Sequence, residues 1–197
     1  MKKFIVPIIL FAAIALMPQA SGAADTYPLG DATIELKIAR INFTDSVVKR
    51  ANVDSGLYLG LEAYTAAAPN IYLGGEFGYS NLDGSSTVFA VRTENEITYV
   101  PLEFNAKFAI GNPNNLAFSM GGGVSLNYVK ERATLPNSVI KTSSDWLLGL
   151  QLFAAIHYVQ DQFFFGADLK LKLTEEFHSA GYDYNNFVYG IHGGLKF

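Results

Sequence analysis

The chain has 197 residues, a length that suits one domain once a leader segment is set aside. Its 14 Lys and Arg residues against 18 Asp and Glu residues give a formal charge of −4, so we expect no nucleic acid as a partner. There is no cysteine, which excludes a disulfide framework and a thiolate metal site.

The first 24 residues differ in pattern from the rest. Two lysines precede an apolar run over residues 4–17, and small side chains follow at residues 21–24. This layout is typical of a secretory signal peptide. A membrane anchor is the alternative, but the run is shorter than the roughly 20 residues with which a helix spans a bilayer. We therefore expect residues 1–24 to be removed and residues 25–197 to form one folded domain.

Apolar and polar side chains then alternate in eight segments, as they do in half-buried strands. These segments are residues 34–43, 57–65, 71–80, 99–108, 116–128, 146–158, 163–173 and 187–197. Each has about the 9 to 11 residues of a tilted transmembrane strand. No stretch after the leader reads as a transmembrane helix. A membrane crossing would therefore be made by strands.

The connections between these segments alternate in length. Short connections are expected at residues 66–70, 109–115 and 159–162. Long connections are expected at residues 44–56, 81–98, 129–145 and 174–186. This alternation is typical of an up-and-down barrel, with turns at the periplasmic rim and four long loops outside the cell.

The composition of the two strand faces distinguishes a barrel from a soluble β-sandwich. In the segment FFFGADLKLKL, one face is apolar and the other holds Asp168, Lys170 and Lys172. The apolar face recurs in all eight segments, and only Arg40 breaks it, near a strand end where its side chain can reach lipid headgroups. The charges of the other face are Glu35, Lys37, Glu62, Glu76, Glu103, Lys107, Asp168, Lys170, Lys172 and Lys196. Equal numbers of acids and bases are expected inside a narrow barrel, because an unpaired buried charge costs several kcal/mol.

Aromatic residues and one proline give further expectations. If strands alternate in direction, Tyr79, Tyr128, Trp146 and Phe187 lie near the outer rim, and Phe108, Tyr158, Phe163 and Phe197 near the inner one. Two aromatic girdles are typical of outer-membrane barrels, although aromatic residues also favour strands in general. Pro101 cannot donate a ladder hydrogen bond, so we expect a β-bulge there.

Three stretches resemble a known family. YVPLEFNAKF at residues 99–108, MGGGVSLNY at 120–128 and YGIHGGLKF at 189–197, together with the leader, are similar to small OmpA-like and OmpX-like barrels of the porin family. The resemblance implies an all-β, eight-stranded antiparallel up-and-down transmembrane β-barrel in the outer membrane of a Gram-negative cell envelope. It also implies membrane lipid and lipopolysaccharide as surroundings, periplasmic chaperones and the barrel-insertion machinery as partners, and a monomer. By the same resemblance, Phe197, Leu195 and Ile191 would form the assembly signal of the last strand.

The function that follows is structural or surface-interacting. Eight strands leave an interior just wide enough for side chains, so we expect the charges to plug the lumen, and a narrow porin-like channel is the alternative. Some relatives by resemblance are lipid A-modifying enzymes with a His-x-Ser spacing. Here His178 and Ser179 are adjacent and would point to opposite faces of a strand. We therefore expect a non-enzymatic protein without catalytic residues or a cofactor.

Two inward histidines, His157 and His192, could ligate a metal. The sequence offers them no third ligand at metal spacing. We therefore expect them to be hydrogen-bonded interior residues.

Overall fold

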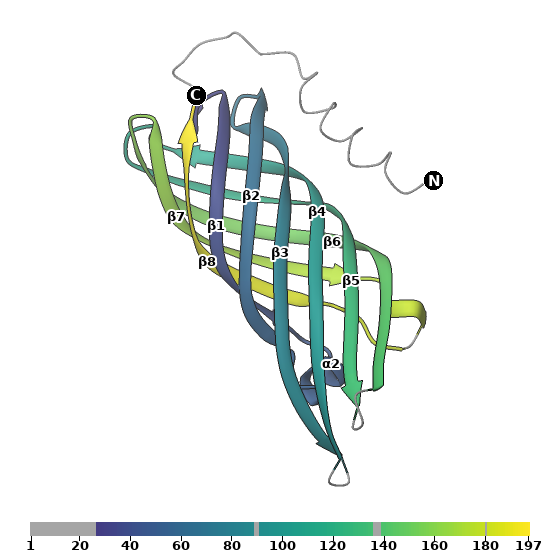
Figure 1. Ribbon diagram of the computed structural model, residues 1–197. Helices are drawn as coiled ribbons and strands as arrows, with labels where there is room; N and C mark the ends of the chain where they lie inside the picture. Colours follow the sequence, from purple (N-terminus) through teal and green to yellow (C-terminus); the bar gives the residue numbers. More distant parts are fainter. Residues whose placement is uncertain (1–26, 89–90, 136–138, 180) are drawn as a thin grey trace.

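The computed structural model describes residues 27–88, 91–135, 139–179 and 181–197, so the expected signal peptide lies outside the described residues. Eight strands form a closed antiparallel barrel in which β8 returns to β1 (Figure 1). Their bounds are β1 Ala32–Phe43, β2 Ser55–Ala68, β3 Ile71–Val88, β4 Val91–Gly111, β5 Leu116–Leu135, β6 Val139–Gln160, β7 Phe163–Thr174 and β8 Asn186–Lys196. The predicted eight-stranded up-and-down barrel is therefore confirmed. No helix within the described ranges has the length and apolar character needed to span a bilayer.

The outer surface of the barrel is apolar. Leu36, Leu152 and Ile191 expose 66%, 67% and 65% of their surface, respectively. So much exposed hydrocarbon is unfavourable in water but suits the lipid-facing band of a membrane barrel. Aromatic pairs lie toward both ends of this band, with ring centroids 5.2 Å apart for Tyr128 and Trp146 and 5.3 Å apart for Tyr158 and Phe165.

Two of the four expected long loops are instead strands. β3, β4, β5 and β6 have 18, 21, 20 and 22 residues, well above the 9 to 11 that cross a bilayer. The β3–β4 ladder continues as far as the pair Val88 and Val91, and the β5–β6 ladder as far as Leu135 and Val139. Figure 1 shows these hairpins projecting past α2, at the end opposite the C-terminus. The loop assignment of residues 81–98 and 129–145 was therefore wrong.

The other two long connections fold over the mouth of the barrel. The first holds α2 (Ser46–Arg50), whose N-cap Asp45 accepts a hydrogen bond from the Val47 N–H at 2.6 Å. The second holds a short 3₁₀ turn, η2 (Phe177–Ser179).

The expected bulge at Pro101 is also absent from the ladders. Pro101 pairs with Asn127 in register, and the β3–β4 register is the same on both sides of the proline. A side chain at Gly78 of β3 would collide with the Pro101 ring, so the glycine leaves room for the proline without a shift. A register shift occurs instead between Ala66 and Ala68 of β2, beside the periplasmic turn.

Candidate functional site

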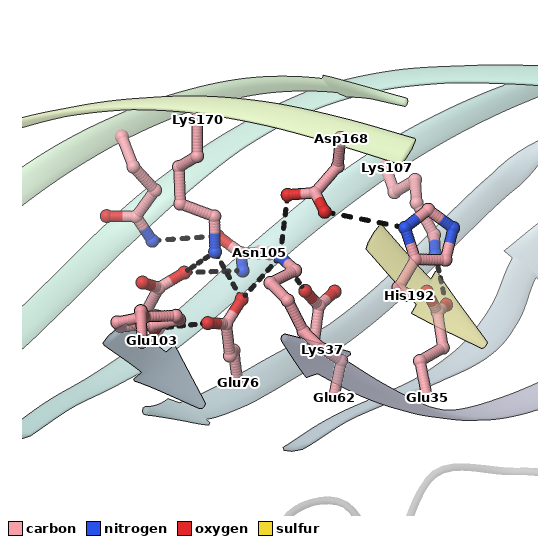
Figure 2. A network of polar contacts seen from close by, with 12 residues as sticks. Glu35, Lys37, Glu62, Glu76, Glu103, Asn105, Lys107, Asp168, Lys170 and His192 are labelled. Atoms are coloured by element: carbon pink, nitrogen blue, oxygen red, sulfur yellow. Dashed lines mark hydrogen bonds and ion pairs between the residues drawn. The ribbon is translucent and has the colours of Figure 1, made fainter. Parts of the chain in front are cut away.

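The interior of the barrel has three layers: an apolar outer cap, a charged middle and an apolar inner cap. The middle layer contains nine of the ten charged residues that the alternation assigns to the inner face, all at most 9% exposed. Strands β1, β2, β3, β4 and β7 supply these nine side chains, because alternate residues of each strand point inward. Figure 2 shows the contacts across the lumen of these side chains other than Lys172.

One centre of the charged layer is Lys37. Its Nζ lies 3.2 Å from Glu76 Oε2 and 3.0 Å from Asp168 Oδ2, and it also pairs with Glu62. Glu76 in turn accepts a hydrogen bond from the Tyr58 hydroxyl. Strands β1, β2, β3 and β7 are thus joined through a single ammonium group.

The second centre is Glu103. Its two carboxylate oxygens lie 2.7 Å from Lys170 Nζ and 2.5 Å from Lys172 Nζ. Lys170 also pairs with Glu76, which links the two centres. Asn105 donates a hydrogen bond to Glu103 Oε2 at 3.2 Å and accepts one from Gln151 Nε2 at 2.7 Å. These contacts give partners to buried polar groups that would otherwise be costly, although Gln151 Oε1 has no hydrogen bond within the described residues.

The remaining charges divide between an inner pair and the rim. Lys107 Nζ lies 2.7 Å from Glu35 Oε1 and 3.8 Å from the Tyr64 ring centroid. Lys196 is not part of the buried network, since it is only part-buried and donates to the Pro113 carbonyl at 2.6 Å. The expectation of equal buried charges was wrong for this reason. Among the described residues, the buried layer holds five carboxylates and four ammonium groups.

The outer cap closes the end of the lumen at which the α2 and η2 connections lie. Val48 and Val53 from the α2 connection pack with Phe177 and with inward residues of the barrel. The other buried members are Ala39, Ile41, Phe43, Tyr58, Leu82, Ile97, Tyr99, Val129, Leu147, Tyr184 and Val188. Sequence analysis missed this cap, although the apolar residues on the inward face of β1, β5, β6 and β8 were a signal for it.

Glu131 of β5 links the connection between β7 and β8 to the outer cap through hydrogen bonds from two tyrosines. Tyr182 donates its hydroxyl to Glu131 Oε1 at 3.0 Å, and Tyr184 donates to the same carboxylate. Burial and the neighbouring carboxylate raise the pKa of both phenols, which therefore stay protonated and remain donors.

The inner cap closes the opposite end, where the chain enters β1. Tyr27 and Leu29, which precede β1, enter the barrel end and pack with Tyr64, Ala66, Tyr72, Ala109, Ala117, Val159 and Phe164. The Leu29 N–H donates to the Tyr72 hydroxyl at 3.2 Å. Gly30 permits this entry because it has a φ of 72°, and a Cβ there would collide with the Phe197 carbonyl.

The two interior histidines lie together between the charged layer and the inner cap. His157 Nδ1 is 2.9 Å from His192 Nε2, and one oxygen of Glu35 completes a cluster whose atoms lie within 4.8 Å of one another. The sequence did not reveal Glu35 as a neighbour, because the three residues come from β1, β6 and β8.

The candidate catalytic pair and the assembly signal lie at opposite ends of the barrel. His178 in η2 is exposed, with Nδ1 3.2 Å from Asp145 Oδ2, and the Ser179 side chain lies outside the described part. Phe197, Leu195 and Ile191 are exposed at 66%, 39% and 65%, on the lipid-facing side of the last strand.

A closed eight-stranded barrel with an apolar outer belt and a filled polar interior defines a small outer-membrane β-barrel protein. Residues 8–197 match the model of the outer membrane protein beta-barrel domain. The chain belongs to this family and resides in the cell outer membrane, amid lipid and lipopolysaccharide.

Solved structures with the same fold agree with this assignment. OprG from Pseudomonas aeruginosa has a TM-score of 0.59 at 18% identity, covering 85% of this chain and 96% of that one. Neisserial surface protein A has a TM-score of 0.58 at 13% identity, with 85% and 98% covered. Ail, the attachment invasion locus protein of Yersinia pestis, has a TM-score of 0.54 at 10% identity, with 85% and 99% covered. At these identities the likeness concerns the fold alone. No curated protein matches the chain significantly.

Proposed function

We propose that the protein is a closed, non-enzymatic barrel that serves a structural or surface-interaction role in the outer membrane. The observation that carries this proposal is the continuous filling of the lumen. Side chains occupy it from the α2 connection, through the ion pairs of Lys37 and Glu103, to Leu29 at the periplasmic end. Such a plug favours rigidity over conduction.

The extracellular end is the proposed contact surface. The paired outer parts of β3, β4, β5 and β6 give it a hydrogen-bonded framework beyond the membrane. Lys130 and Arg132 are exposed on β5, just past the rim pair of Tyr128 and Trp146. Two cations at this level suit the phosphates of lipopolysaccharide headgroups. A monomer is proposed, because the eight strands of one chain close into a complete barrel without an open edge.

A lipid A-modifying enzyme is less well supported. The imidazole of His178 contacts Asp145 in an exposed turn, and among the described side chains it has no hydrogen bond to a nucleophile. An acyl-transfer site needs such a contact between base and nucleophile. Unchanged lipid A mass spectra after deletion of the gene are the result expected from a non-enzymatic role.

Conductance measurements test the closed lumen. The folded protein inserted into planar bilayers should give no unit conductance steps, because ions would have to cross two apolar caps and a layer of paired charges. A wide porin in the same bilayer is the positive control for insertion and detection. Reproducible steps of a single size from the purified protein would contradict a closed barrel and favour the narrow channel.

We also propose that the last strand is read by the barrel-insertion machinery, with chaperones delivering the unfolded chain. Support comes from Phe197, Leu195 and Ile191, which present one lipid-facing row at the end of β8. Replacing Phe197 by serine should reduce the amount of folded barrel in cells several-fold, measured by heat-dependent gel mobility of outer membranes. Refolding of the same variant into detergent should be nearly unchanged, since Phe197 packs on lipid. A loss in both assays would mean that Phe197 acts through stability.

A further inference from the structure

We propose that Glu35, His157 and His192 bind one divalent transition-metal ion inside the barrel. Their ligand atoms lie within 4.8 Å of one another, although the residues come from three strands. Two imidazoles and one carboxylate form a donor set that suits Zn²⁺, with a further position left for water. This inference does not depend on the closed-lumen proposal, because a cation can lie within either a plug or a path.

The two histidines are oriented for ligation. Asp168 Oδ1 lies 3.4 Å from His192 Nδ1, and Ser119 Oγ lies 2.8 Å from His157 Nε2. When these oxygens accept N–H groups, the other two ring nitrogens, 2.9 Å apart, are both unprotonated and can act as ligands to one ion bound beside them. Without an ion, one ring donates an N–H to the other across the same distance. Oxygen partners on the outward nitrogens are the usual support of metal-bound histidines.

The separation of the facing nitrogens is close to that of a metal site. Zinc–nitrogen bonds of roughly 2.0 to 2.1 Å in a tetrahedron place two ligand atoms about 3.3 Å apart. The observed 2.9 Å therefore requires the rings to separate by only a few tenths of an ångström. Space is present as well, since Glu35, His157, His192 and Ser119 line a cavity of about 10 Å³, room for one water-sized ligand.

The overall charge of the buried layer is compatible with a cation. Within the described ranges it holds five carboxylates and four ammonium groups, and Lys107, which lines the cavity, already pairs with Glu35. Glu35 Oε1 accepts hydrogen bonds from both the Lys107 ammonium and the Thr33 hydroxyl. Within the described part of the chain its other oxygen has no hydrogen bond or ion pair, which leaves it available as a ligand.

The inner cap determines how metal must be supplied. Phe164 packs against both rings, with centroids 5.8 Å from His157 and 6.2 Å from His192, and belongs to the apolar periplasmic cluster. Metal would therefore enter most readily while the barrel folds. The experiment accordingly refolds the unfolded mature chain, made without a histidine tag and stripped of metal, into detergent with a small excess of Zn²⁺.

After removal of unbound ions, elemental analysis should find one zinc per folded chain. His178→Gln is the matched control, since it removes the exposed histidine of the chain and should leave zinc binding unchanged. His157→Gln and His192→Gln should lose the bound zinc. Heat-dependent gel mobility verifies that each variant is folded.

Ser119→Ala provides a second test that keeps all three ligands. Loss of the oxygen beside His157 should weaken zinc binding roughly 10-fold or more. With Co²⁺ in place of Zn²⁺, the wild type and His178→Gln should show the visible absorption of four-coordinate cobalt. Absence of metal from the folded wild type would overturn the proposal and leave the His157–His192 contact as a hydrogen bond. Equal zinc in His157→Gln and wild type would overturn it as well.

Discussion

Leu152→Arg is expected to destabilise the barrel in lipid by about 2 to 4 kcal/mol, the cost of a cation on the lipid face near the bilayer midplane. Leu152 is 67% exposed near the middle of the span of β6 between Trp146 and Tyr158. Its neighbours across the strand, Gly122 and Leu171, offer no carboxylate. The arginine would therefore have neither water nor a counter-ion.

Gln160→Arg is the matched control for this prediction. Gln160 is on the same face of β6 but past Tyr158, at the periplasmic end, where an arginine reaches water. The folded fraction of both variants in lipid vesicles, followed by gel mobility along a urea series, measures the difference. Equal stability of the two variants would mean that the exposed face of β6 does not contact the hydrocarbon core.

The fold was predictable because a barrel needs only one local rule. Side chains of a strand alternate between faces, so the lipid and lumen faces could be separated by parity wherever the composition differed. This rule does not identify strands beyond the membrane. There, both faces of β3 and β4 carry mainly polar residues, such as Asp83, Ser85 and Glu94, which give no apolar–polar alternation to follow. The strand extensions were for that reason interpreted as loops.

The sequence predicted which charged residues point into the barrel, but not which of them contact one another. Parity assigns Lys37 and Asp168 to the inner face, but their ion pair across the lumen depends on the tilt and register of strands far apart in sequence. For the same reason, the sequence did not reveal that Glu35 lies beside the two histidines. The caps were missed because Ile41 and Leu147 look like ordinary strand residues, and only the positions of α2 and η2 reveal that they lie under a cover.

Glu103→Gln should produce the other large effect, a loss of about 3 to 5 kcal/mol, which is typical of breaking a buried ion pair. Lys172 is fully buried, and Glu103 is its sole carboxylate partner within the described residues. Lys170 would keep Glu76, so most of the loss should come from the Lys172 ammonium left without a counter-ion. Urea unfolding in vesicles, followed by the fluorescence of the single tryptophan, Trp146, measures it.

A double-mutant cycle separates the pair from the rest of the network. Lys172→Met should cost less than Glu103→Gln, because Glu103 would keep Lys170 as a counter-ion. Combining the two changes should recover much of the loss, since neither charge of the pair then remains buried alone. Losses that simply add would show that the two residues act independently. Recovery would show that Glu103 is required chiefly as the counter-ion of Lys172, so that the charged layer stabilises the barrel only as a matched set.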